Sequence, residues 1–208
     1  MNRFGVEGAY LAEPMMPYGV PASAFTASHL LHHFTATVEI PLLMVRYYNF
    51  TGDTELFQEK ILPVVEACLD FMNNFYDEND ENGKMIMYPA NSLESGEYAT
   101  NSANMLAPMT ALLDELLALP SGSLSSAQMS KFVAMRNRMP ELPTRELEGV
   151  TFLAQEEARE GFMHGVESPE LYSVWPSGLF ASVSSTEDID IARQTFAART
   201  KYWNLFGD

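Results

Sequence analysis

The strongest constraint on the fold is a repeated helical spacing of apolar residues, separated by short breaks. Ser28 to Phe50 carries apolar side chains every three or four residues. Thr51-Gly52-Asp53 follows and supplies a glycine stop and an aspartate N-cap for the next helix. So short a connection predicts two antiparallel helices. The second helix contains Pro63, which should bend it, and its apolar stripe consists of Phe57, Ile61, Val65, Cys68, Met72 and Phe75.

Two more helical pairs are predicted further along the chain, and they make the fold class all-α, an array of αα-hairpins. Short strands are expected at Lys84 to Tyr88 and at Val150 to Leu153, so that short β-hairpins lie in the loops. No fixed sequence period is present, which weighs against tetratricopeptide, HEAT and ankyrin solenoids. The additional helices are expected at Asn101 to Leu119, Ser125 to Arg138, Pro169 to Ala181 and Glu187 to Trp203.

Composition excludes several classes of partner. The 208 residues include 28 acidic and 12 basic side chains, for a formal charge of −16. Such a chain repels nucleic acid and anionic lipid, so we expect neither partner, whereas neutral sugars remain compatible. Cys68 is the only cysteine and falls on an apolar stripe, so we expect a buried, inert thiol. No signal peptide is visible in Met1 to Tyr10, and the compartment stays open.

The loop Tyr88-Pro89-Ala90-Asn91-Ser92-Leu93-Glu94-Ser95 is the best candidate for a functional segment. It lies between helical segments and combines a carboxylate with amide, hydroxyl and aromatic side chains. Loops that a rigid scaffold positions often carry chemistry. Two interpretations of Glu94 are open. It is either a catalytic or sugar-binding carboxylate, or an acid at a helix start that offsets the helix dipole.

Histidines and acids elsewhere give weaker signals. His29 and His33 are four residues apart and would share a helical face, but no glutamate follows His29, so the zincin pattern fails. The acidic turn Asp77 to Gly83 resembles a calcium loop, but Pro89 stands where a bidentate glutamate is required. We therefore expect no metal and no cofactor. Glu39, on a helix with few charges, is either a general-acid candidate or a loop cap.

The segment Glu167 to Pro176 is the third candidate. Pro169 and Glu170 suit the first turn of a helix, which favours a structural role for Glu170. Tyr172 and Trp175 are three residues apart and would share a face. They form either an aromatic platform for a sugar or part of a core stripe.

Three segments together resemble one group of enzymes. Tyr47 to Asp53, Tyr88 to Glu94 and Pro169 to Pro176 occur in this order in six-hairpin glycoside hydrolases. The chain most resembles the helical toroid of the family 95 α-L-fucosidases and their bacterial relatives, from about Glu13 onward. The middle segment is similar to the Pro-Ser-Asn-Ser-Pro-Glu-Asn loop of the fucosidases.

The resemblance implies inverting hydrolysis of a glycosidic bond, a carbohydrate substrate and a secreted or periplasmic parent protein. It implies that Glu94 is a cleft carboxylate, our candidate catalytic residue. The substrate-binding candidates are His33, Tyr88, Asn91, Ser92 and Trp175.

The chain also departs from the fucosidases. No Asn-x-Asn pair precedes His29, and Asn101 to Leu119 contains no clear counterpart of their catalytic acid. Six hairpins close such a toroid, and this chain offers about three. We therefore expect residues 1–208 to form one partial toroid domain of a longer protein, inactive when isolated. The alternatives are a non-catalytic carbohydrate-binding protein and a helical scaffold or interaction module.

Overall fold

The computed structural model describes residues 4–12, 28–93, 96–157, 167–180 and 184–202. The described elements, in chain order, are α1 (Ser28–Leu31), α2 (Thr35–Thr51), α3 (Thr54–Leu56), the π-helical η1 (Phe57–Ile61), α4 (Leu62–Phe75), β1 (Ala90–Ser92), β2 (Gly96–Ala99), α5 (Ala103–Leu117), α6 (Ser126–Arg138), β3 (Thr144–Leu147), β4 (Val150–Leu153), the 3-10 helix η2 (Pro169–Ser173) and α7 (Thr186–Tyr202). None of these helices combines the length and apolar character needed to span a bilayer.

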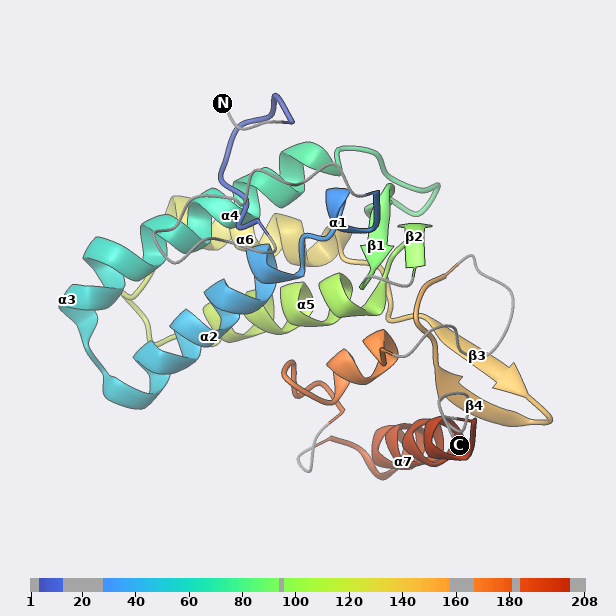
Figure 1. Ribbon diagram of the computed structural model, residues 1–208. Coiled ribbons are helices and arrows are strands. Elements are labelled where there is room, and N and C mark those ends of the chain that lie inside the picture. Colours follow the sequence, from blue (N-terminus) through green and yellow to red (C-terminus); the bar gives the residue numbers. More distant parts are fainter. Residues whose placement is uncertain (1–3, 13–27, 94–95, 158–166, 181–183, 203–208) are drawn as a thin grey trace.

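The helices form paired layers. Figure 1 shows α2 and α5 side by side, with α4 and α6 along one side of this pair and β1 and β2 at one end. The C-terminal elements β3, β4, η2 and α7 lie together on another side, and η2 packs against α5. Helical hairpins with small β-hairpins in the loops confirm the expected array, in an arrangement consistent with part of a toroid.

The connection after α2 follows the sequence prediction. Gly52 has φ +69°, a left-handed conformation that glycine adopts at little cost, and its N–H donates to the carbonyl of Tyr48 at 2.8 Å. The carboxylate of Asp53 accepts the N–H of Leu56 at 3.0 Å. The π-helical turn η1 ends two residues before Pro63, which lies in the first turn of α4.

The single helix expected over Ser28 to Phe50 is wrong, because the chain breaks between α1 and α2. The carbonyl of His32 accepts the N–H of Asn91, at 3.1 Å, instead of continuing the helical ladder. As a result His29 and His33 are not on one continuous helix. The break also places Phe34 in the core.

One apolar core fills the space between the helices. Its buried members all lie between Phe34 and Met139. The ring of Phe34 is 5.0 Å from that of Phe71 and 5.1 Å from that of Phe75, in edge-to-face contacts that aromatic rings favour. The Cys68 thiol is buried as expected, and burial raises its pKa to about 12, which makes it unreactive.

Of the two strands predicted from the sequence, one is wrong and the other is confirmed. Lys84 to Tyr88 forms no strand, because its backbone bonds to several separate partners: Met85 donates to the carbonyl of Arg138 at 2.7 Å, and Met87 to the amide oxygen of Asn101 at 2.9 Å. The strand lies two residues later, where β1 pairs with β2. The expected strand Val150 to Leu153 is confirmed as β4, and β3 is its partner.

Of the two helices predicted for the third pair, only one is confirmed. Pro169 to Ala181 was expected to be helical, but η2 spans only five residues. Pro176 has no N–H for a helical ladder, and Gly178, at φ +75°, turns the chain. The other member, α7, agrees closely with the expected Glu187 to Trp203.

Candidate functional site

The loop singled out by the sequence is fixed where α2 and α5 begin. The carbonyl of Asn91 accepts the Ser102 hydroxyl at 3.2 Å and the Asn104 side-chain amide at 3.2 Å. The same Asn104 amide donates to the hydroxyl of Thr35 at 2.7 Å. Thr35 opens α2, and Ser102 is the N-cap of α5. Strand β1 is therefore bonded directly to the start of α5 and, through the Asn104 side chain, to the first residue of α2.

Ser92 is bonded to a third part of the chain. Its hydroxyl lies 3.4 Å from the carbonyl of Gln155, which also accepts the N–H of Ala103 at 2.8 Å. The positive ends of the α2 and α5 dipoles meet at this strand. An oxygen-rich ligand or a carboxylate at this place gains from that field.

The candidates on this loop differ in exposure. Asn91 and Ser92 are buried, each 1% exposed, and His33 is also buried. Tyr88 is 54% exposed, and Pro89 behind it accepts a hydrogen bond from the buried Tyr76 hydroxyl at 2.9 Å. Tyr88 is thus the most exposed candidate among the described residues of this loop. Glu94 lies outside the described residues, so its role stays a prediction.

The metal hypothesis gains nothing from the structure. The His29 side chain is outside the described part of the chain, and the break after α1 separates His33 from that helix. Within the described residues, no group of three or more His, Cys, Asp and Glu side chains is placed to hold a metal ion.

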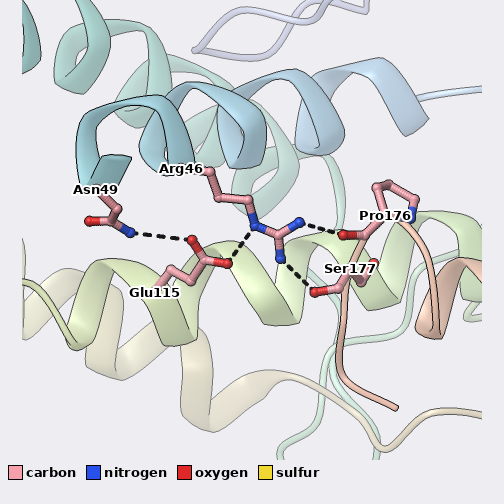
Figure 2. A network of polar contacts seen from close by, with 5 residues as sticks. All are labelled: Arg46, Asn49, Glu115, Pro176 and Ser177. Carbon is pink, nitrogen blue, oxygen red and sulfur yellow. Dashed lines mark hydrogen bonds and ion pairs between the residues drawn. The ribbon is translucent and has the colours of Figure 1, made fainter. Parts of the chain in front are cut away.

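The third candidate segment, Glu167 to Pro176, is bonded to the C-terminal part of the α2–α5 pair. Figure 2 shows Arg46 of α2 between Glu115 of α5 and the carbonyls of Pro176 and Ser177. Its Nε is 2.7 Å from Glu115 Oε1, and its Nη2 is 2.6 Å from the Ser177 carbonyl. The Asn49 side-chain amide donates to the other Glu115 oxygen at 3.4 Å.

This network fixes the two residues after Trp175 beside Arg46 of α2. Arg46 follows Thr35 by eleven residues, which is roughly 16 Å along α2. Trp175 is 76% exposed, so the core-stripe interpretation is wrong for this ring. The indole lines an apolar groove of about 830 Å³ between η2 and α7, together with Leu171, Val174, Phe180 and Phe196. None of the loop candidates Tyr88, Asn91 and Ser92 lines this groove.

Glu170 has an environment that the sequence did not reveal. It lies in the first turn of η2, as expected, but it is fully buried, with Oε1 3.8 Å from Nε of the buried Arg199. Burial raises the pKa of Glu170, while its own backbone, Arg199 and Gln155 oppose that rise. No local sequence signal could reveal this pair, because Arg199 follows Glu170 by 29 residues in the chain.

A polar pocket near the loop was also missed by the sequence analysis. It has a volume of about 610 Å³, and its walls include Asp80, Lys84, Asn101, Glu141 and Glu157. The Asn101 amide donates to the Glu157 carboxylate, and its oxygen accepts the N–H of Met87. The pocket thus borders the segment that leads into Tyr88. Its residues come from four separate segments of the chain, so sequence spacing gave no signal.

Comparison with known proteins identifies the family. A family model described as the glycosyl hydrolase family 95 catalytic domain matches residues 3–129, which is more than half of the chain. The matched region includes α2, α4, α5 and the whole Tyr88–Ser95 loop, but not η2 or α7. A search of curated proteins found no match. The match confirms the resemblance seen in the sequence: this chain belongs to glycosyl hydrolase family 95.

Proposed function

We propose that this chain is part of a catalytic domain that hydrolyses α-L-fucosides or closely related glycosides with inversion of the anomeric centre. The observation that carries the proposal is the attachment of the Asn91–Ser92 strand to the start of α5 and, through Asn104, to the first residue of α2, within the region that matches the family. Family membership itself implies a carbohydrate substrate. The α-L-fucoside specificity and the inversion follow from the resemblance of the Tyr88–Glu94 loop.

Inversion needs two carboxyl groups, one to protonate the leaving oxygen and one to activate water, about 6.5–9.5 Å apart. We assign one of these roles to Glu94. Asn91 and Ser92 hold the loop and supply hydrogen bonds near the substrate, while Tyr88 and His33 contact the sugar. Trp175 is followed by residues bonded to the C-terminal half of α2, so we expect it to contact only a sugar unit of an extended glycan that lies beyond the cleaved bond.

The chain is also proposed to form one partial toroid, over residues 1–208, with α2 and α5 as inner helices and α4 and α6 as outer ones. The matching member of the catalytic pair would then come from elsewhere in a longer protein. Asn104, at the start of α5, carries an amide and cannot donate a proton as a carboxylic acid does. The isolated chain should therefore be inactive.

A non-catalytic carbohydrate-binding protein is the second candidate, and one observation favours it. The side chains bonded to the carbonyl of Asn91 are a hydroxyl and an amide, those of Ser102 and Asn104. Such groups bind sugar hydroxyls without transferring protons efficiently. Under this alternative, the protein would bind fucosides and leave them intact.

The test uses the complete protein, expressed with its flanking coding sequence and assayed on a panel of aryl glycosides that includes an α-L-fucoside. Glu94→Gln should lower kcat by about 10²-fold or more, because it removes a catalytic acid or base. Glu55→Gln, an exposed acid on α3, is the matched control and should leave the rate unchanged. Full activity of Glu94→Gln would remove Glu94 from the mechanism. Tight fucoside binding without turnover would favour the second candidate.

A further inference from the structure

The hairpin of β1 and β2 is irregular opposite Asn91. The two strands pair at two places, and these are Ala90↔Ala99 and Ser92↔Gly96. Between these pairs β1 has one residue, Asn91, whereas β2 has two, Glu97 and Tyr98. Two residues opposite one make a β-bulge, a feature that is common beside active sites because it re-aims a side chain. The bulge sets Tyr98 across the ladder from Asn91.

Tyr98 has a backbone conformation that suits glycine better than tyrosine. Its φ is +57°, and a left-handed residue at a bulge is usually glycine, because a Cβ crowds the backbone there. In the described part of the chain, four residues other than glycine have a positive φ, and three of them, Leu93, Tyr98 and Asn101, lie in or next to this hairpin. Strain of this kind gathers at functional sites. It indicates that the Tyr98 side chain contributes something that glycine cannot.

The ring of Tyr98 lies at the surface but has a rigid support. It is 56% exposed, and its centroid is 6.0 Å from that of His32. The His32 ring is in turn 6.3 Å from the rings of Phe34 and Phe75, and its backbone carbonyl accepts the N–H of Asn91. The exposed ring is therefore linked through His32 to the aromatic rings of the core. A ring held in this way loses little conformational freedom when it binds a ligand.

The hairpin combines polar groups with exposed aromatic surface. Asn91 and Ser92 supply an amide and a hydroxyl, which suit sugar hydroxyls but offer no apolar area. Tyr88 precedes β1 by two residues and Tyr98 belongs to β2, and each is more than half exposed. A pyranose also has an apolar face of ring C–H groups, which in L-fucose is extended by a methyl group. Aromatic rings bury such surfaces.

We propose that Tyr98 is a specificity-determining residue of the sugar site, and that its ring packs on the apolar face of an L-fucosyl unit bound beside Asn91. His32 is the positioning residue that supports this ring from the side of the core. The inference rests on the proposed function, since it names the residue that contacts the apolar face of that substrate. It accounts for a tyrosine at a position where the backbone favours glycine.

The experiment titrates methyl α-L-fucoside into the ¹⁵N-labelled 208-residue chain and obtains the dissociation constant from amide shifts. Tyr98→Ala and Tyr98→Gly should each weaken binding about 10-fold, because both remove the aromatic surface. Tyr98→Phe keeps the ring and should bind like the wild type. The matched control is Tyr47→Ala, which removes a tyrosine of similar exposure, 53%, from α2 and should leave the constant unchanged.

Thermal unfolding of the same variants separates binding from a structural role. Glycine adopts a φ of +57° without strain, so Tyr98→Gly should unfold at a higher temperature than Tyr98→Ala, although both bind weakly. A purely structural tyrosine would instead give variants that lose cooperative unfolding together with binding, and this result would overturn the proposal.

The binding data also separate this proposal from the proposed hydrolysis. Fucoside binding by the wild type that is equally tight in Tyr98→Ala, or that is lost in Tyr98→Phe, would overturn the role of Tyr98 and leave the carbohydrate substrate standing. A wild-type chain that binds no fucoside would overturn the role of Tyr98 as well. Complete protein that binds through Tyr98 without turnover would contradict the hydrolysis alone.

Discussion

Two parts of the molecule, residues 34–139 and the C-terminal elements β3, β4, η2 and α7, are stabilised by different interactions. Residues 34–139 share one apolar core that includes every fully buried large aromatic ring in the described structure. The C-terminal elements contact the rest of the chain through the packing of η2 against α5 and through directed polar bonds, such as that between Arg46 and Ser177, and they enclose an open apolar groove. The comparison suggests a rigid scaffold for the Asn91–Ser92 strand and a C-terminal part that opens at lower free energy.

The largest effect should come from the core. Phe34→Ala removes a buried ring at the break before α2 and should lower the free energy of unfolding by about 3–5 kcal/mol. Phe196→Ala, on the exposed side of α7, should cost less than about 0.5 kcal/mol. Urea unfolding of both variants measures the contrast. Equal losses would mean that the C-terminal half has a core of its own.

A smaller effect is expected where the two halves meet. Arg46→Met removes charged hydrogen bonds to Glu115, Pro176 and Ser177, and should cost about 1–3 kcal/mol. The loss should increase hydrogen exchange in η2 and the turn after it, and leave α4 unchanged. Arg136→Met breaks the more exposed pair with Asp114 and serves as the control, with an expected cost of about 0–1 kcal/mol. Unchanged exchange in η2 would show that the Arg46 network does not hold this segment.

The smallest effect concerns the buried carboxyl of the C-terminal half. The folded-state pKa of Glu170 is raised above its ordinary value of 4.5, so folding favours the protonated form. Its contribution to stability is present below pH 4.5 and is lost as pH rises through the folded-state pKa. The free energy of unfolding of Glu170→Gln, relative to the wild type, should therefore increase from pH 4 to pH 7. A flat or falling difference in urea titrations would contradict the raised pKa.

Local sequence signals predicted the scaffold well. Apolar spacing and caps such as Gly52, Asp53 and Ser125 act within one or two turns, so α4, α5, α6 and α7 could be placed from the sequence. The Ser125–Gln128 capping box forms as a reciprocal pair at the start of α6. These features depend on neighbours in the chain and not on tertiary contacts.

Features that depend on distant partners were missed. The break before Phe34 depends on the bond between His32 and Asn91, and the burial of Glu170 depends on Arg199. The loop was correctly located between helical pairs, but its attachment through Asn104 and Thr35 required the packing of α2 against α5. The sequence could also not show that the turn after Trp175 is bonded to Arg46 of α2.

The most direct test of the account is where a sugar binds. A titration of the ¹⁵N-labelled chain with L-fucose should shift amide resonances of residues 88–93 and 101–104, because the oxygen-rich strand at the positive ends of α2 and α5 is the proposed sugar site. The amides around Trp175 should stay unchanged at the same concentrations. Shifts confined to the groove between η2 and α7, with none near Asn91, would contradict the proposed position of the carbohydrate site.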